Sequence, residues 1–414
     1  MVINANNLET PSIARLADDR AAQQDPHDVD GKLIEWLKHD RARGEFAAVH
    51  IAPDGASDVP DEMEARLVVL GPEYPHVTRA DDSRAIKAEE ETLNSRGAGQ
   101  RLYKNMLVFA AADAKALPNL QQAMRLLMAW TSIVDAHEAL NLDPVHRKQA
   151  ESKKKELEGT VEARMQETWI WALVPGQSDP RGREMEWEVS RLQGQDELAL
   201  RASKKLMHDD ALLTRMGPVR LKLELDKHLW TDVDHLNTRK LWEWMASYLY
   251  LPRLKNSDVL LEAIQGGVGE LVCDNFAYAG CYNEETRRYE GLILTGGGMV
   301  VIDDLSVVIK PDVARVQQAA ETEAPDDEKE PTGGGAGGEG SEGTDTEGEG
   351  AVTLPRRFFA TVEVDADRAA RDVGKIAEEV LQHLTVLPNR DRSRSSGRRR
   401  RGHPARRHRE LSDP

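Results

Sequence analysis

The chain has 414 residues, a formal net charge of −17, 40% apolar residues and 5% aromatic residues, so it is long enough for more than one hydrophobic core. No stretch approaches the roughly 20 apolar residues of a membrane-spanning helix, and the N-terminal residues lack the basic-then-apolar layout of a secretory signal. Two cysteines, Cys273 and Cys281, exclude a disulfide-stapled secreted scaffold and predict a reducing cytoplasm.

Residues 1–140 are predicted to form an α/β domain with a parallel or mixed sheet layered with helices. Short helices are expected before residue 30, and further helices over about 32–43 and 81–95. Three apolar runs read as strands: Phe46–Ile51, Ala65–Leu70 and Met106–Ala112. Pro118 then opens a segment with helical spacing of its apolar residues.

Polar residues bracket the third run, which we expect to be the central strand. Arg101, Lys104 and Asn105 precede it, and Asp113 follows it. This polar frame could reach a nucleotide at an edge of the sheet. Alternatively, these are the charges that flank any buried strand.

Residues 141–230 are predicted to form a helical arm plus strands. Asp143 and Pro144 supply an N-cap and a first-turn proline for a helix over about 144–166, which forms either an antiparallel arm or a solvated helix on the body. Strands are expected at Thr168–Val174 and Met185–Leu192, with a helix over 195–207. Strict alternation from Val219 to Asp226 predicts another, half-buried strand.

Residues 231–318 are predicted to form a winged-helix-like α+β module, although many small α+β modules share its element order. Asp232 or Asp234 is expected to cap a helix that Pro252 stops. A second helix over 257–264 leads into the glycines at 266, 267 and 269. Strands are expected over 275–282, 289–294, 299–302 and 305–309, with turns at 283–287 and at Asp303-Asp304.

The C-terminal part divides into three segments. Residues 319–352 are a Gly/Glu-rich stretch that predicts a disordered acidic linker. Residues 353–388 are predicted to form a small strand–helix unit. Residues 389–414 form a tail with ten arginines and three acids, predicted to be disordered. Its run Arg398, Arg399, Arg400 and Arg401 is a candidate nucleic-acid contact, although no aromatic residues are interleaved for base stacking.

Motifs that carry catalytic chemistry are missing from the sequence. It contains no G-x-x-x-x-G-K-[ST] phosphate-binding loop, no H-E-x-x-H and no G-x-S-x-G. The apolar run Met299–Ile302, followed by two aspartates, resembles the strand that holds Mg²⁺ in P-loop ATPases, but its context favours a hairpin turn. We therefore assign no catalytic residue, metal site or cofactor to this chain from its motifs.

Several stretches together resemble one protein family. They are FAAVHIAPDGASDVPDEMEARLVVLGPEYPH, RLYKNMLVFAAADAKAL, LALRASKKL, SYLYLPRL and PRRFFATVEVDADRAARDVGKIAEEVLQHL. These stretches look like large prokaryotic predicted ATPases of the AAA type, catalogued as domain of unknown function family 499. The resemblance covers most of residues 10–320 and 353–388.

The resemblance implies a role in anti-phage or DNA-modification systems, because such proteins are often encoded in defence islands beside DNA methyltransferases. It implies ATP and Mg²⁺ only through an N-terminal nucleotide-binding half that would precede this chain. We therefore expect a non-catalytic C-terminal portion or split subunit, with a separate P-loop half and a DNA methyltransferase or other defence protein as partners. The alternative is a stand-alone nucleic-acid-binding or protein-interaction module, with a winged-helix-like domain and a basic tail.

Overall fold

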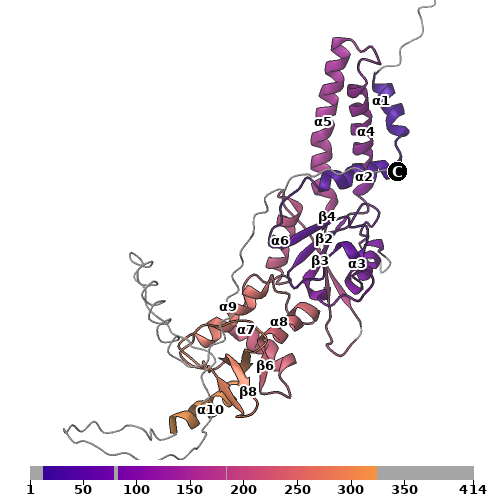
Figure 1. Ribbon diagram of the computed structural model, residues 1–414. Helices are drawn as coiled ribbons and strands as arrows, with labels where there is room; N and C mark the ends of the chain where they lie inside the picture. Colours follow the sequence, from indigo (N-terminus) through magenta and orange to yellow (C-terminus); the bar gives the residue numbers. More distant parts are fainter. Residues whose placement is uncertain (1–12, 79–82, 183, 324–414) are drawn as a thin grey trace, which may run out of the picture. The chain divides into compact units, whose positions relative to one another are not determined.

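The computed structural model describes residues 13–78, 83–182 and 184–323, and every structural statement below refers to this part of the chain (Figure 1). Most of the predicted linker, the predicted strand–helix unit over 353–388 and the tail with Arg398–Arg401 lie outside these described residues.

Five strands form a mixed sheet in the order β1-β2-β3-β4-β5. They are β1 (Ala48–Ile51), β2 (Arg66–Val69), β3 (Leu107–Ala112), β4 (Trp169–Gly176) and β5 (Glu186–Arg191). The first three pair in parallel, and β4 and β5 continue the sheet in antiparallel register. The predicted α/β class with a parallel or mixed sheet is therefore confirmed.

Strand β3 is the centre of this sheet, as its unbroken apolar sequence predicts, because all six of its residues are buried. Val108 and Ala110 face one apolar cluster, whereas Leu107 and Phe109 face a second cluster on the opposite side. Alternate residues of a strand point to opposite faces, so a strand buried on both sides carries no polar positions. Helices must therefore cover both faces of the sheet.

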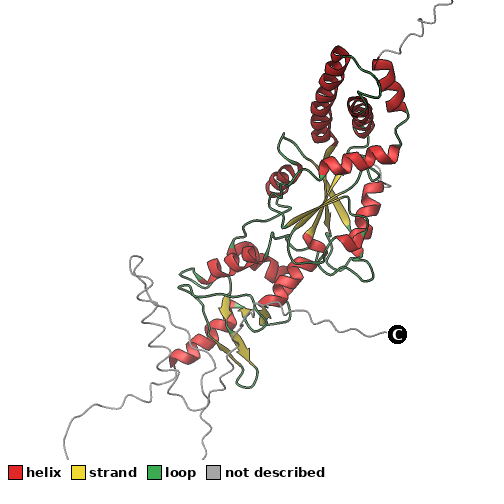
Figure 2. Cartoon of the chain, turned by 45° about the horizontal axis from the view of Figure 1, so that its top comes forward, coloured by secondary structure: helices red, strands yellow, loops and turns green. Residues whose placement is uncertain are grey.

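Helices do cover both faces, as Figure 2 shows around the yellow sheet. The first cluster takes apolar residues from α2 (Pro26–Leu37), α4 (Leu117–Asp135), α5 (Pro144–Thr168) and α6 (Leu198–His208). The second takes Ala85 and Leu93 from α3 (Arg84–Asn94). The helix predicted over 32–43 begins and ends six residues earlier than expected, since α2 spans Pro26–Leu37. Asp25 caps it and Pro26 occupies its first turn.

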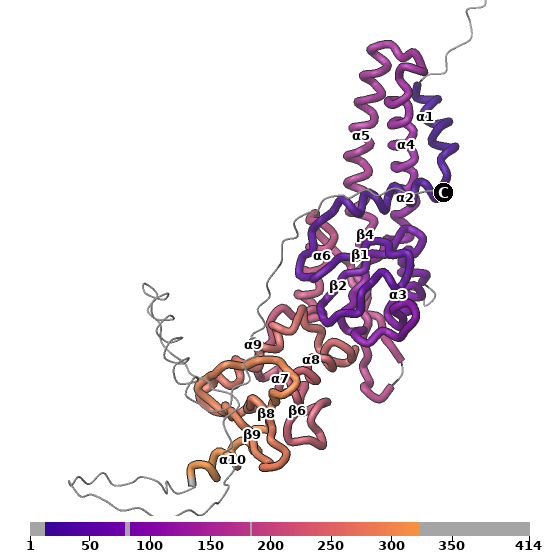
Figure 3. Tube along the Cα trace, in the orientation of Figure 1, coloured from indigo at the N-terminus to yellow at the C-terminus, as the bar shows by residue number. Residues whose placement is uncertain are grey.

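Helices α4 and α5 pack along each other, with α1 (Ile13–Ala22) against α4 (Figure 3). The Asp143 carboxylate accepts a hydrogen bond from the backbone N–H of His146 at 2.8 Å, which confirms the predicted N-cap of α5. Ile13 and Ala17 of α1 pack with Trp130 and Ile133 of α4 in an apolar cluster of their own. The charged helix α5 is thus held by few buried residues, mainly at Ala150, Val161 and Met165.

The main sheet and the two clusters on its faces form the first core. The residues after Leu212 build a second core, whose two apolar clusters also take in Met106. Its helices are α7 (Pro218–Glu224), α8 (Thr238–Ser247), α9 (Ser257–Val268) and α10 (Pro311–Glu323), with a π-helical turn over Leu225–Leu229. Its strands are β6 (His235–Asn237), β7 (Ala277–Ala279), β8 (Cys281–Asn283), β9 (Arg288–Glu290) and β10 (Val307–Ile309). Strands β6, β10 and β7 form an antiparallel sheet, and β8 and β9 form a hairpin.

The strand predicted from Val219 to Asp226 is wrong, since this segment is helical: α7 extends to Glu224 and the π-helical turn begins at Leu225. Leu221 and Leu225 are fully buried, whereas Val219 and Leu223 are 62% and 61% exposed. Residues four apart lie on one face of a helix. An apolar residue at every second position therefore also places apolar residues four apart, which is the spacing of a helical face. Pro218 begins the helix at a position where its missing N–H costs no hydrogen bond.

Five further features of this region differ from the prediction. Asn237, not Asp232 or Asp234, caps α8, because its side chain accepts from the Lys240 N–H at 2.9 Å. Helix α8 ends at Ser247, five residues before Pro252. Helix α9 continues through Gly266 and Gly267. The segment 299–302 is not a strand, and α10 includes the first five residues of the predicted linker over 319–352.

Close packing in α9 leaves no room for a side chain at Gly267. A methyl group at this position would lie 2.5 Å from Cζ of Phe276, a fully buried ring. We expect Gly267→Ala to lower the free energy of unfolding by about 1–2 kcal/mol, since overpacking outweighs the helix propensity that alanine adds. Urea titration followed by circular dichroism measures this change.

Gly159 supplies the matched control, because it lies inside α5 and a methyl group there meets no atom within 4 Å. Gly159→Ala should raise stability by about 0.5–1 kcal/mol. Equal gains in both variants would show that Phe276 does not restrict Gly267.

The two cores are joined at the residues just before β3. Asn105 donates from its side-chain amide to the carbonyls of Met245 at 2.8 Å and Leu251 at 3.1 Å. The backbone carbonyl of Asn105 accepts in turn from Nε of Arg253 at 2.6 Å. Met106 is fully buried in the second core. The chain therefore passes from the second core into the first directly before β3.

Candidate functional site

Arg101, predicted as part of a ligand frame, is engaged within the fold. Its guanidinium is buried and donates to the carbonyls of Thr92, Pro60, Ala56 and Val59 at 2.8–3.1 Å. These bonds hold the loop before β2 against α3. Burial lowers the pKa of the Arg101 guanidinium, while the nearby Asp61 carboxylate opposes that shift.

The other predicted frame residues do not converge on one point. Asp113 follows the last residue of β3 and accepts from the Trp171 indole at 3.0 Å and from the backbone N–H of Lys115 and Ala116 at 2.9 Å. Arg101, Lys104 and Asn105 precede the first residue of the same strand. The structure therefore brings Arg101 and Lys104 to one end of β3 and places Asp113 at the other.

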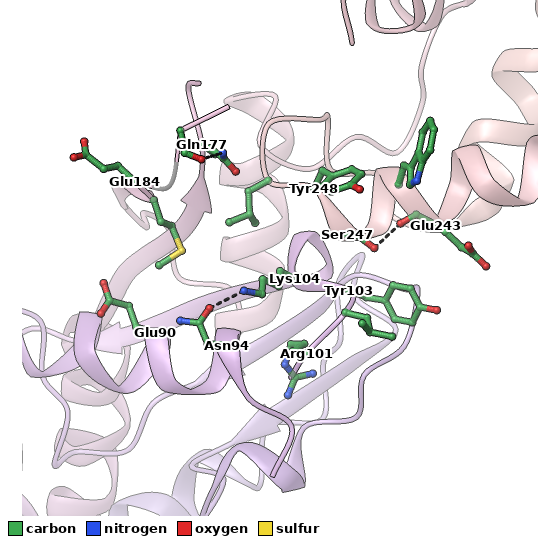
Figure 4. A pocket seen from close by; sticks show the side chains of 15 residues that line it. Glu90, Asn94, Arg101, Tyr103, Lys104, Gln177, Glu184, Glu243, Ser247 and Tyr248 are labelled. Atoms are coloured by element: carbon green, nitrogen blue, oxygen red, sulfur yellow. Dashed lines mark hydrogen bonds between the residues drawn. The ribbon is translucent and has the colours of Figure 1, made fainter. Parts of the chain in front are cut away.

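Arg101 and Lys104 do border a pocket of about 920 Å³. Its walls come from the end of α3, from residues 101–104, from the end of α8 with the residues that follow it, and from four residues between β4 and β5 (Gln177, Gly182, Glu184 and Met185). Figure 4 shows the side chains that line it. The pocket lies where the first core meets the second.

Acidic side chains dominate the charge of this pocket. Glu90, Glu184 and Glu243 line it, and none of them forms an ion pair within the described residues. Lys104 donates from its ammonium to Oδ1 of Asn94 at 2.7 Å. Burial lowers the pKa of the Lys104 ammonium. The three carboxylates outnumber the two cations of the lining, Arg101 and Lys104, and hydrogen bonds within the fold already engage both cations, so the pocket is unfavourable for phosphate groups.

Aromatic rings from the residues around the end of α8 form another wall. Trp244 and Tyr248 line the pocket together with Tyr103. The Lys240 ammonium lies 5.0 Å from the centroid of the Trp244 ring, a cation–π contact. Tyr248 stacks on Tyr250 at 5.3 Å between ring centroids, yet its side chain remains 41% exposed.

Beneath the pocket lies the apolar cluster on the α3 face of the sheet. Met185 and Leu249 line the pocket and pack against this cluster. Glu89, on the buried face of α3, is fully buried, and its two carboxylate oxygens accept no hydrogen bond from the described residues. Burial, reinforced by the charge of Glu90, raises the pKa of the Glu89 carboxyl well above its usual range.

Sequence reasoning missed the acidic and aromatic walls of this pocket. Glu243, Trp244 and Tyr248 occur in a segment that reads as an amphipathic helix, and that pattern predicts packing rather than a binding wall. Glu90 lies in a predicted polar helix with several other glutamates. The sequence does contain one signal of the aromatic wall. Aromatic residues are concentrated at 242–250, although they make up only 5% of the chain.

No group of three or more histidine, cysteine, aspartate or glutamate side chains is arranged within the described residues to hold a metal ion. None of the helices described is both long and apolar enough to cross a bilayer.

Comparison with family models, with curated proteins and with solved structures gives no match to this chain.

Proposed function

We propose that this chain is a non-catalytic C-terminal portion or split subunit of an AAA-type ATPase, acting in a prokaryotic anti-phage or DNA-modification system. In this proposal it is cytoplasmic and couples a separate P-loop half, which supplies ATP and Mg²⁺, to a partner such as a DNA methyltransferase. The helices α1, α4 and α5 serve as its arm. The proposal rests on the family resemblance of the sequence.

The structural observation that supports it is the open edge of the sheet at β1. Strands β2 and β3 are wholly buried, whereas all four residues of β1 are only half-buried, and no strand of the described residues pairs with its outer side. Such an edge offers unpaired backbone groups to a further strand. A second pocket of about 480 Å³ lies along β1, lined by His50 and Asp54 among others.

The two acids after the run Met299–Ile302 are occupied in ways that fit a non-catalytic role. The Asp303 carboxylate accepts from the backbone N–H of Leu305 and Ser306, at 3.0 and 2.7 Å, which is the predicted turn. Asp304 lies 3.3 Å from the guanidinium of Arg239. These acids stabilise a turn beside α8.

The test is ATP turnover by the purified chain, alone and with the product of a neighbouring reading frame that carries a P-loop. We expect no Mg²⁺-dependent hydrolysis by the chain alone, and co-purification together with turnover when both proteins are present. Robust turnover by the chain alone would overturn the proposal.

The alternative function is a protein- or nucleic-acid-binding module over residues 231–318. It is favoured by the order of α7, β6, α8, α9 and the following β-hairpin, which is that of a winged-helix-like unit. Helix α9 would be the recognition helix, but it carries Asp258 and Glu262 and no lysine or arginine. That charge favours a protein partner over phosphate.

Mobility shifts with the full chain and with a truncation ending at residue 388 test this alternative. Binding that disappears with the tail and falls steeply with salt would assign the contact to Arg398–Arg401 and their neighbours. Salt-resistant binding by the truncated chain would instead assign it to the 231–318 module.

A further inference from the structure

We propose that the pocket between α3 and the end of α8 binds a basic peptide segment of a partner protein, through arginine or lysine side chains. The inference does not depend on the ATPase assignment, because it follows from the geometry and charge of the pocket. In the proposed split ATPase the pocket would be one docking site for a partner. In a stand-alone module it would be the principal docking site.

The pocket is large enough to hold several side chains of a ligand. Its volume of about 920 Å³ lies at the upper end of the range of pockets that bind small molecules. Figure 4 shows Glu90 and Glu184 on one side of the pocket and Glu243 on the other. Carboxylates on separate walls suit an extended ligand with more than one cation, rather than a single ion.

The aromatic wall of the pocket already holds a cation of the chain itself. The Lys240 ammonium lies over the Trp244 ring, on the same wall as the exposed Tyr248. Aromatic faces attract ammonium and guanidinium groups, and guanidinium groups also stack on them. Tyr248 and Tyr103 offer further rings at the pocket surface.

The three carboxylates of the pocket are available to pair with a ligand. Glu90, Glu184 and Glu243 have no ion-pair partner within the described residues, and the hydrogen bond between Lys104 and Asn94 holds the lysine of the pocket. A carboxylate that meets an arginine forms a charge-assisted hydrogen bond, often with two contacts. A metal ion is a poorer fit, because no set of three such ligands converges in the described part of the chain.

The test uses the full chain and a fluorescent 12-residue peptide of alternating arginine and serine, with binding followed by anisotropy. We expect saturable binding that the double variant Glu90→Gln, Glu243→Gln weakens at least about tenfold. Trp244→Leu should also weaken it. Both glutamate substitutions keep side-chain shape, and circular dichroism confirms folding.

The acidic body of the chain requires a control of equal charge. Glu162→Gln with Glu167→Gln removes two exposed carboxylates from α5, away from the pocket lining. This variant should retain the affinity of the unaltered chain.

Equal loss in the pocket and control variants would reduce the binding to general charge attraction and overturn the proposal. Absence of binding would overturn it as well. If spermidine binds as tightly as the peptide and displaces it, the site is one for free polyamines, and the peptide assignment is wrong.

Discussion

Replacement of Arg253 by methionine is expected to lower the free energy of unfolding by about 3–5 kcal/mol. The buried guanidinium donates to the carbonyls of Asn105, Pro175 and Ala211 at 2.6, 2.9 and 3.1 Å. Methionine fills a similar space but leaves three buried acceptors without donors, and an unpaired buried polar group is costly. Burial lowers the pKa of Arg253 to about 10, so its charge persists at neutral pH.

This arginine also decides whether the two cores unfold together. Its acceptors are Asn105 just before β3, Pro175 at the end of β4 and Ala211, which packs on the first apolar cluster, whereas Arg253 itself lies between α8 and α9 of the second core. Removal of its donors should therefore uncouple the two cores. Urea unfolding of the variant should then show a broadened or divided transition, where the unaltered chain shows one.

Arg220→Met is the matched control, because the Arg220 side chain is 40% exposed and its ion pair in the described part of the chain is with Asp210, at 3.3 Å. It should change stability by less than about 0.5 kcal/mol. A loss below about 1 kcal/mol in Arg253→Met would contradict the structural role assigned to that residue.

Replacement of Glu89 by leucine is expected to raise stability at pH 8 by about 1–3 kcal/mol, because a buried carboxyl without partners costs desolvation energy. Its side chain lies on the face of α3 that carries Ala85 and Leu93 into the apolar cluster beneath the pocket. The indole N–H of Trp187, which packs on that cluster, also has no partner in the described residues. Leucine would extend the cluster.

The pH dependence follows from the raised pKa of Glu89. Below the ordinary glutamate pKa the carboxyl is protonated in both folded and unfolded chains, so it imposes no ionisation penalty. As the pH rises through the interval between the unfolded and folded pKa values, the unfolded chain releases its proton first, and stability falls. Glu89→Leu removes this contribution, so its advantage should grow from pH 5 to pH 8.

Thermal unfolding at both pH values measures the effect, with Glu91→Leu as the control, since Glu91 is exposed on the same helix. If the Glu89→Leu variant is less stable than the unaltered chain at pH 8, Glu89 is stabilised by a hydrogen bond in solution and the prediction is wrong.

Local sequence patterns were sufficient for most elements of the first core. The apolar run of β3 predicts a strand buried on both faces, and Asp143-Pro144 predicts the start of α5, because both signals depend on neighbouring residues. The same local reasoning failed at Val219–Leu225, where alternating leucines satisfy the periods of both a strand and a helix. Packing of Leu221 and Leu225 into the second core selects the helix.

The sequence by itself determined the α/β class, the strands of the main sheet and the absence of a phosphate-binding loop, since each depends on the type and spacing of neighbouring residues. Only the tertiary structure decided that Asn105 and Arg253 join two cores across 148 positions of the chain. It alone brought Glu90 of α3 to the same pocket as Glu243 of α8. Long-range contacts form because whole faces of helices and sheets are buried together and because buried backbone groups must find hydrogen-bond partners. Neither requirement can be seen in the pattern of neighbouring residues.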